Sequence, residues 1–424
     1  MFERHFFSDP LAGRIHKIAN YRRMTTTARA VGGMLAIAFA AIGLTDAGAQ
    51  TVRQREAESA VGAIATELPA GSGGQNNAEV EPPAAAEPPS TAEQSPASPA
   101  SPPAAVEQAP PANVSVAARA EQAIREGVVF LSGEQQDNGA WGKPGGGHQC
   151  GVTSLCALAL VRSGVQTNDL RIRRAVEFLG TQQPTGTYEV GLQTVALCTI
   201  DPGRHARLIE RNVTWLEGCQ VREGQNQGSW SYGVQDNAAG RGDLSCTGFA
   251  IWGLDAAAQA GAKVRDETWE QALAYYVKAQ TRDGGWGYTV GAPFTTGSMT
   301  ASGLASVALS LSHIRSGAKQ PTDSEKQVLE RGRGWLAANF VADRNPPDQK
   351  AFSLYSLYYQ LMVRRAGEAL HEDSFGTHEW RRELADYLLK QQHPKTGAWT
   401  SLPGGDPILD TAFVVLTIGA AATR

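Results

Sequence analysis

One seven-residue pattern recurs along the second part of the chain and constrains its fold more than any other feature. In the segment QTRDGGW at 280–286, a glutamine is followed four residues later by a glycine and two residues after that by a tryptophan. With small changes of spacing and one tyrosine, the pattern returns at Trp141, Tyr188, Trp230, Trp286 and Trp399. The interval between Trp286 and Trp399 is about twice the others, so we infer a further unit that has lost the motif. This period predicts a repeat architecture.

Two kinds of helix flank each motif. The segment before it has one apolar face, as in Trp269, Leu273, Tyr276 and Val277, which predicts an outer helix with one side in water. The segment after it is apolar nearly all round and rich in small residues, as in LQTVALCTI at 192–200, so it must be covered on several sides. The unit without a motif has the same two segments, around 325–340 and 349–362.

Six outer and six inner helices therefore alternate, and we expect an all-α fold. Hairpins of this kind bury their inner faces only by stacking, and six can close into an α/α toroid with an inner and an outer ring of helices. An open solenoid of the same hairpins is the alternative. In the toroid, all motif loops and all N-termini of the inner helices lie at one end of the ring. We expect a structural role for the motif, with glycine in the turn, glutamine bonding free carbonyl groups and tryptophan packing between units.

The first part of the chain has a different composition. Residues 31–44 (VGGMLAIAFAAIGL) are an apolar run followed by Ala47-Gly48-Ala49, so residues 1–49 are predicted to be a signal peptide or a membrane anchor. The start codon, Met1 or Met24, stays open, as does cleavage of the segment. Either alternative places the remainder outside the cytoplasm, in a periplasm or secreted.

Residues 50–116 are rich in Ala, Pro, Glu and Ser and contain almost no large apolar side chains. Such a segment cannot offset its ordering entropy by burial, so we predict a disordered linker. The repeat domain then covers residues 117–424.

Charge and cysteine content limit the partners. The chain has a net charge of −4, and removing residues 1–49, which are basic, makes it more acidic, which argues against nucleic acid as a partner. A membrane tether through residues 31–44 is compatible with this charge. Five cysteines leave at least one free thiol or an intermolecular bond, and their pairing and the oligomeric state stay open. The cysteines are Cys150, Cys156, Cys198, Cys219 and Cys246.

Two segments, GDLSCTGFAIWGL at 242–254 and HEWRRELADYLL at 378–389, resemble the terpene cyclase and protein prenyltransferase superfamily. The similarity extends over roughly 117–424 and looks strongest to exported bacterial proteins with prenyltransferase and squalene oxidase repeats. This resemblance implies the α/α toroid, whereas function would follow only by analogy.

The resemblance also identifies candidate acids. Squalene-type cyclases protonate an alkene with the middle Asp of Asp-x-Asp-Asp-Thr-Ala. Asp243 and Thr247 match the first Asp and the Thr, but Ser245 stands at the acid position; Asp410 and the two residues after it match the last three, but Leu409 stands at the acid position. Asp243 and Asp410 are the candidate catalytic residues, also as a carboxylate pair for a glycan. Their structural alternatives are a helix N-cap for Asp243 and a dipole or inter-helix contact for Asp410.

A metal site is the second chemistry that the resemblance suggests. Prenyltransferase β subunits hold zinc with Asp-x-Cys on one inner helix and His on the next. Cys246 can take the Cys place, but Leu244 replaces the Asp and no His follows at 298–300. His148 and Cys150 begin the first inner helix and could join Cys246 in an unfamiliar zinc site. We expect no cofactor, with zinc as the alternative.

Aromatic residues on the inner helices predict a ligand cavity. The candidate ligand-binding residues are Phe249, Trp252, Tyr355 and Phe413. We therefore expect an exported toroid that binds an apolar or extended ligand without the catalytic sets of the superfamily, and isoprenoid, peptide and glycan stay undistinguished. A divergent cyclase or prenyltransferase-like enzyme is the first alternative, and a scaffold acting through its outer helices is the second.

Overall fold

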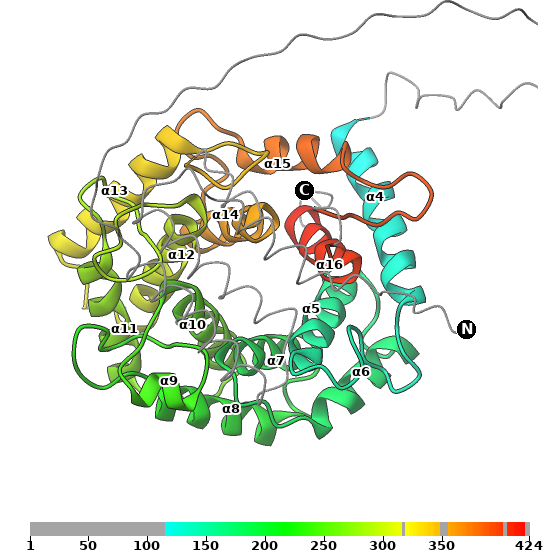
Figure 1. Cartoon of the computed structure of the whole chain (residues 1–424), viewed down its shortest axis with the longest axis horizontal. Helices are drawn as coiled ribbons and strands as arrows, with labels where there is room; N and C mark the ends of the chain where they lie inside the picture. The colour runs from blue at the N-terminus through cyan, green and yellow to red at the C-terminus, as the bar shows by residue number, and fades with distance from the viewer. Residues whose placement is uncertain (1–114, 316–318, 348–354, 402–404, 420–424) are drawn as a thin grey trace, which may run out of the picture. The chain divides into compact units, whose positions relative to one another are not determined.

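The computed structural model describes residues 115–315, 319–347, 355–401 and 405–419. The predicted signal or anchor segment and the body of the predicted linker lie outside the described residues. Figure 1 shows the described helices as two concentric rings. The outer helices are α4 (Val116–Gly133), α6 (Leu170–Thr181), α8 (Ala206–Cys219), α11 (Asp266–Ala279), α13 (Asp323–Asn339) and α15 (Trp380–Leu389).

The inner ring contains the other helix of each hairpin. These helices are α5 (Gln149–Arg162), α7 (Thr187–Ile200), α10 (Leu244–Gln259), α12 (Gly297–Ile314), α14 (Ser356–Leu370) and α16 (Pro407–Ile418). A short extra helix, α9 (Val234–Ala238), lies between α8 and α10 in the chain. Each inner helix packs against the next, and α16 packs against α5. The ring is therefore closed, which confirms the predicted α/α toroid of six hairpins and excludes the open solenoid.

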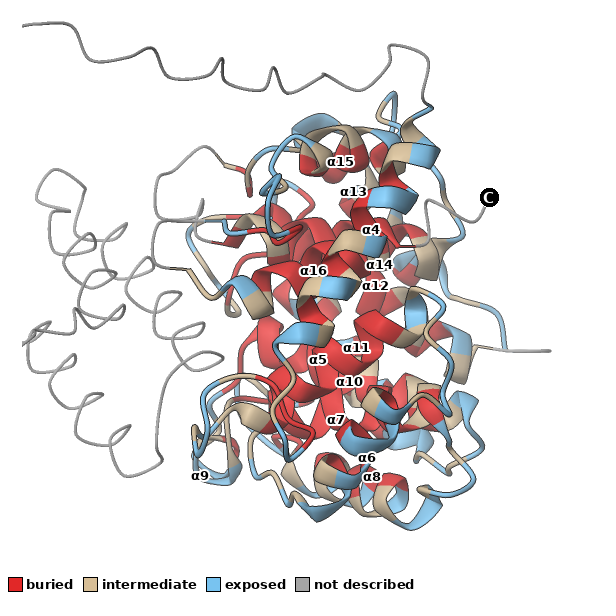
Figure 2. Cartoon of the chain, turned by 90° about the vertical axis from the view of Figure 1, so that its right-hand side faces the viewer, coloured by how far each residue is buried: buried red, intermediate tan, exposed pale blue. Residues whose placement is uncertain are grey.

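The contrast between the two rings follows from the apolar pattern of the sequence. In α7, 12 of 14 residues are buried, whereas α6 buries four of 12, all on one face. Figure 2 shows the same difference across the domain, with the inner helices mostly buried. Small residues permit close packing within the inner ring: a Cβ on Gly253 of α10 would lie 2.8 Å from the Cα of Gly191 on α7. Among the helices described, none combines the length and hydropathy needed to cross a bilayer.

The fifth hairpin differs from the prediction at its inner helix. Its outer helix, α13, begins at a capping box in which Thr322 and Glu325 bond each other's backbone N–H groups. Its inner helix, α14, begins at Ser356 and continues to Leu370, eight residues beyond the predicted end. Residues 348–354, where we expected the helix to start, lie outside the described residues.

Four of the motif tryptophans form the same clamp between helices. Each is buried; its indole N–H donates to a carbonyl of the preceding outer helix, and its backbone N–H donates to a threonine hydroxyl of the following inner helix, at 2.6–3.1 Å. This tryptophan clamp confirms the structural role predicted for the motif. The tryptophans with their two partners are Trp141 (Leu131, Thr153), Trp230 (Leu216, Thr247), Trp286 (Tyr276, Thr300) and Trp399 (Leu388, Thr411).

The glutamine of each clamped motif joins neighbouring hairpins. The Gln280 amide donates to Gly284 in its own loop at 2.7 Å and to Val328 on the next outer helix at 2.8 Å. Gln135 and Gln220 make the equivalent pairs of bonds. Gln392, in the last motif, donates to Ala123 on the first outer helix at 2.9 Å, so the same bond closes the ring.

Loops of neighbouring hairpins also bond through their backbones. The N–H of Thr187 donates to the carbonyl of Tyr232, and the N–H of Leu244 donates to that of Tyr288, both at 2.9 Å. We call the end of the ring that carries these loops and the N-termini of the inner helices the motif end. The C-termini of the inner helices lie at the opposite end.

Candidate functional site

The second hairpin departs from the tryptophan clamp. Its motif aromatic, Tyr188, already belongs to α7, which begins directly after Gly186. The side-chain amide of Gln182 bonds only within its own helix end, to Thr181 and Phe178, and does not reach a neighbouring hairpin. Gln193 instead donates to the carbonyl of Leu179 at 2.8 Å. The early start of α7 places two side chains, those of Tyr188 and Glu189, against other inner helices.

Glu189 forms a close pair with His148, the residue that precedes α5. Its Oε1 lies 2.6 Å from Nδ1 of His148, and the two side chains are 9% and 17% exposed. Nε2 of His148 is buried and has no hydrogen-bond partner among the described residues. Cys150, two residues later, is buried, and its pKa is raised by burial and by the charge of Glu189. A carboxylate-oriented imidazole with a free nitrogen is an arrangement that can accept or donate a proton.

Asp243 lies at the start of α10, the inner helix that follows α7 and packs against it. It is the N-cap of that helix, and its Oδ1 accepts the N–H of Cys246 at 2.8 Å. The residue is only 3% exposed, and its Oδ2 has no hydrogen-bond partner among the described residues. Burial raises the pKa of Asp243 to about 7, although the hydrogen bond from the backbone of Cys246 favours the charged form. The carboxyl group is therefore poised between its two protonation states near neutral pH.

Five buried tyrosines on α7, α11 and the motif loops respond to the charge of this carboxyl group, as does Tyr358 of α14. Burial raises the pKa of each phenol, and the charge of Asp243 raises it further, so all five stay protonated and can donate hydrogen bonds. Three contacts join pairs of these tyrosines: the hydroxyls of Tyr232 and Tyr288 lie 2.6 Å apart, and the ring centroids of Tyr188 and Tyr232 and of Tyr275 and Tyr276 lie 5.9 and 5.8 Å apart. Tyr188 also donates to Oγ of Ser245 at 2.7 Å. We call the following set the tyrosine cluster: Asp243, Tyr188, Tyr232, Tyr275, Tyr276 and Tyr288.

Aromatic rings continue from the tyrosine cluster along the inside of the ring. Tyr188 meets Phe249 edge to face with centroids 4.8 Å apart, and Phe249 stacks on Tyr358 of α14 at 5.8 Å and 18°. Phe249 and Tyr358 are each 2% exposed. Trp252, 6.0 Å from Phe249 towards the opposite end, is half-buried, and Arg365 of α14 lies 3.8 Å over its ring. We call Tyr188, Phe249, Tyr358 and Trp252 the aromatic column.

The predicted site residues are only partly brought together. Phe249 and Trp252 lie in the aromatic column, while Tyr355 is the N-cap of α14 and Phe413 is buried on α16. Asp243 and Asp410 begin α10 and α16, which stand opposite each other in the inner ring with two helices between them on either side. The two carboxylates therefore belong to opposite sides of the inner ring. Asp410 accepts the backbone N–H and the hydroxyl of Ser401, both at 2.8 Å.

The three candidate zinc ligands are also apart. His148 is paired with Glu189, and α7 separates His148 and Cys150 from Cys246 on α10. Within the described ranges, no group of three or more His, Cys, Asp or Glu side chains is placed to hold a metal ion. All five cysteines are free thiols in the structure.

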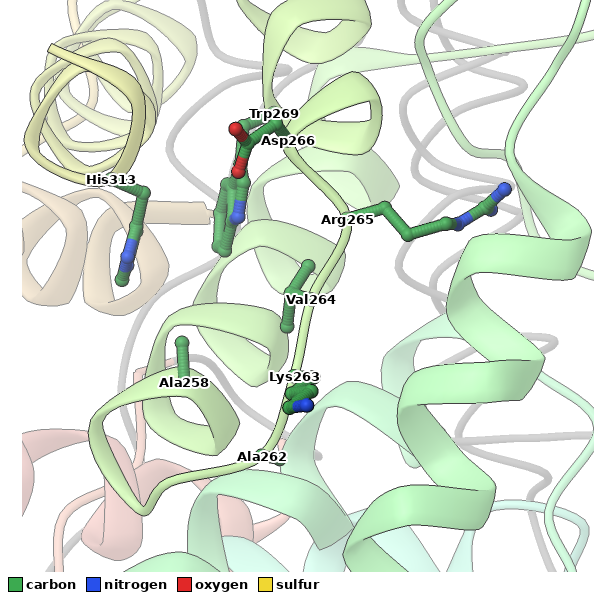
Figure 3. Close-up of a pocket in the computed structure, with 8 residues that line it drawn as sticks. All are labelled: Ala258, Ala262, Lys263, Val264, Arg265, Asp266, Trp269 and His313. Atoms are coloured by element: carbon green, nitrogen blue, oxygen red, sulfur yellow. The ribbon is translucent and has the colours of Figure 1, made fainter.

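A pocket of about 460 Å³ opens at the opposite end of the ring (Figure 3). It lies between the end of α10, the start of α11 and the end of α12. The ring of His313 stacks on Trp269 at 4.3 Å, and its Nε2 lies 3.0 Å from Oδ1 of Asp255. Figure 3 shows Arg265 pointing away from the pocket, where it pairs with Glu217 at 3.0 Å. The pocket is lined by Ala258, Ala262, Lys263, Val264, Arg265, Asp266, Trp269 and His313.

Several residues of the site were missed in the sequence. Glu189 and Tyr188 were signalled by the one motif that has tyrosine in place of tryptophan. Tyr232 and Tyr288 each stand two residues after a motif tryptophan, a regularity that marks them as a pair. Arg365 lies in the part of α14 beyond the predicted helix end, where no sequence pattern pointed to the ring interior.

Comparison with known proteins shows a similarity of fold alone. No family model matches the sequence, and no curated protein is significantly similar to it. A type II terpene cyclase from Scytonema, solved with the product merosterolic acid A, is 12% identical with a TM-score of 0.50, covering 72% of this chain and 98% of the cyclase. An α-1,6-mannanase of Salegentibacter, an inactive variant solved with α-1,6-mannotriose, is 9% identical with a TM-score of 0.54, covering 72% and 99%. The chain thus shares the α/α-toroid fold of terpene cyclases and of a mannanase.

Proposed function

We propose that the toroid binds an extended apolar ligand inside its inner ring. The aromatic column carries this proposal, because its half-buried member, Trp252, continues a row of packed aromatic rings towards the opposite end of the ring. Phe249 and Tyr358 close the interior at their level, whereas Trp252 is half-buried. The accessible wall therefore begins at Trp252 and favours entry from the opposite end of the ring.

The fold neighbours support a ligand of this shape. The terpene cyclase was solved with merosterolic acid A and the mannanase with α-1,6-mannotriose, so toroids of this size accommodate extended ligands of either kind. Aromatic rings stack on sugars as well as on hydrocarbon chains. We favour the apolar class because Phe249, whose ring lies 6.0 Å from that of Trp252, is buried and apolar.

Titration calorimetry on the purified full-length chain tests the proposal. We expect farnesol to bind and mannotriose not to bind. Trp252→Ala should weaken farnesol binding about tenfold, since it removes a large apolar contact. Trp215→Ala is the matched control, because Trp215 is a half-buried tryptophan on outer helix α8 and should leave binding unchanged. No binding of farnesol, or equal binding by wild type and Trp252→Ala, would contradict the proposal.

A second candidate function is acid–base catalysis at the motif end. The observation that favours it is the buried Asp243, with a pKa of about 7 and one unpartnered oxygen, beside phenols that can donate hydrogen bonds. Turnover of a bound ligand, followed by mass spectrometry, should then disappear in Asp243→Asn. Retained turnover in that variant, or none in the wild type, removes this candidate.

We also propose that the chain is exported and that residues 31–44 direct or anchor it. Their apolar composition and the Ala47-Gly48-Ala49 pattern support this. Cell fractionation should recover the wild-type chain outside the cytoplasm, and deletion of 31–44 should retain it inside. Recovery of both proteins in the cytoplasm would refute the proposal.

A further inference from the structure

The third hairpin has the longest motif loop among the clamped hairpins. Its clamp tryptophan and threonine are 17 residues apart, against 12, 14 and 12 in the other three. The extra residues include α9, and the two ends of the loop meet where Trp230 pairs with Asp243, whose N–H donates to the Trp230 carbonyl at 3.0 Å. We call residues 231–242 the α9 loop. Figure 2 shows α9 at the periphery of the domain, so this loop is an Ω-loop that projects from the motif end.

The α9 loop adjoins the carboxyl group of Asp243 through both of its ends. Its C-terminal end leads directly into Asp243, and near its N-terminal end the hydroxyl of Tyr232 lies 2.6 Å from that of Tyr288. The carbonyl of Tyr288 in turn accepts the N–H of Leu244, the residue after Asp243, at 2.9 Å. Asp243 is only 3% exposed in this arrangement. The loop and Tyr288 therefore separate the carboxyl group from solvent at the motif end.

Few contacts hold the α9 loop against the rest of the domain. In α9 only Asn237 is buried, and the described hydrophobic core includes no side chain of this helix. A backbone bridge to Gly186 holds the start of the segment 233–241. From outside the α9 loop, the described residues bond the rest of this segment at one point, where Nδ2 of Asn226 donates to the Gly240 carbonyl at 3.0 Å. Segments with so few buried apolar contacts open locally at a low free energy.

Two polar atoms gain partners when this loop opens. Oδ1 of Asn237 accepts the N–H of Ser231, whereas its Nδ2 is buried without a partner among the described residues, as is Oδ2 of Asp243. Buried polar atoms without partners are costly, and water that enters on opening would satisfy both. Glycines on either side of α9 supply the backbone freedom: Gly233 precedes the helix, and Gly240 has a φ of 68°, in the left-handed region that favours glycine.

We propose that the α9 loop is a lid, which opens as a unit and admits water and small polar solutes to Asp243 from the motif end. The ring then has two separate entrances, this one and the apolar one at Trp252. A solute that enters through the lid reaches the carboxyl group without passing the buried ring of Phe249. Opening of the lid is independent of ligand binding at Trp252, so it holds whether or not farnesol binds there.

Carboxyl labelling of the purified full-length chain tests the lid. A water-soluble carbodiimide with glycine ethyl ester modifies the carboxyl groups that it can reach, and peptide mass spectrometry gives the rate at each site. We expect Asp243 to react more slowly than the fully exposed Asp323 but faster than Asp255, which lies on the same helix and is more exposed in the closed structure, at 7% against 3%. Equal rates at Asp243 and Asp323 would show that no lid covers the carboxyl group. A rate at Asp243 no higher than that at Asp255 would show that the loop does not open.

Two variants shift the labelling rate in opposite directions. Asn226→Ala removes the hydrogen bond to Gly240 and should speed the labelling of Asp243 about fivefold. Gly233→Ala should slow it about threefold, because the backbone there is extended, a Cβ has room, and alanine leaves the open loop fewer conformations.

A matched control separates the lid from general loosening. Gln225→Ala removes a side-chain bond to the carbonyl of Val290, outside the α9 loop, and should leave the rate at Asp243 unchanged. The rate at Asp255 should stay constant in all three variants. Equal changes at Asp243 and Asp255, or an unchanged rate at Asp243 in both loop variants, would overturn the inference. The wild-type rates decide even where a variant does not fold.

Discussion

The second hairpin and the four clamped hairpins carry the same sequence motif, but its residues make different contacts. In the clamped hairpins, a buried tryptophan bonds an outer helix on one side and an inner helix on the other. In the second hairpin, Tyr188 bonds Ser245 on the neighbouring inner helix, and Glu189 bonds His148. In the clamped hairpins the motif joins the outer ring to the inner ring. In the second hairpin it directs the titratable side chains of Tyr188 and Glu189 towards other inner helices.

The largest expected effect comes from breaking one clamp. Trp286→Ala removes a fully buried side chain and one of the two hydrogen bonds to the carbonyl of Tyr276, which keeps that from the Gln280 N–H. We expect a loss of about 5 kcal/mol in the free energy of unfolding, measured by urea denaturation. Trp215→Ala, at a half-buried position outside the motif, should lose much less. Equal losses at the two positions would show that the clamp has no special role.

The next effect tests whether Asp243, in the clamped hairpin that follows the irregular one, stores an unfavourable charge. Burial raises the pKa of Asp243 from 3.8 to about 7, so wild-type stability should fall as pH rises from about 4 to 7 and then level off. Asp243→Asn keeps an N-cap and has no charge to bury, so its stability relative to wild type should grow over this window, by up to about 4 kcal/mol.

Urea denaturation of both proteins between pH 4 and 8 measures this difference. Asp406→Asn is the control, because Asp406 also caps an inner helix but is not fully buried. A gap between Asp243→Asn and wild type that is constant with pH would mean that the carboxyl group ionises in the folded chain as it does in water.

A smaller effect separates the glutamines of the two regions. Gln280→Ala leaves the carbonyls of Gly284 and Val328 without their side-chain donor and should cost about 2 kcal/mol. Gln182→Ala, in the second hairpin, breaks only bonds within its own helix end and should cost less than about 0.5 kcal/mol. Thermal unfolding of the two variants makes the comparison, and a similar shift for both would remove the distinction between the hairpins.

The smallest expected effect is at Tyr188. Tyr188→Phe keeps the ring against Phe249 and removes the hydrogen bond to Ser245, so we expect a loss of about 1 kcal/mol. Farnesol binding should change by less than a factor of two, because the aromatic surface is preserved. A loss of stability as large as that of Trp286→Ala would mean that Tyr188 is a clamp residue after all.

Sequence reasoning gave the fold because the fold depends on a periodic signal. Apolar faces at helical spacing identified all six hairpins, and the motif glycines and tryptophans do what their local chemistry predicts. The contacts inside the ring were harder to predict, because they depend on which inner helices face each other. Asp243 and Asp410 looked equivalent along the chain, yet they begin helices on opposite sides of the ring. No sequence pattern marked Arg364, which is buried although buried arginines are rare.

The bond from Gln392 to Ala123 has a consequence for how the domain unfolds. In a linear array of repeats, the terminal units have one neighbour each and fray first. In this ring the first and last hairpins are each other's neighbours, so every hairpin has two, and removing any one exposes two interfaces at once. Five of the six junctions are also joined by the chain, whereas the sixth is held by side chains and packing alone. Cooperative loss of structure should therefore begin at this single non-covalent seam.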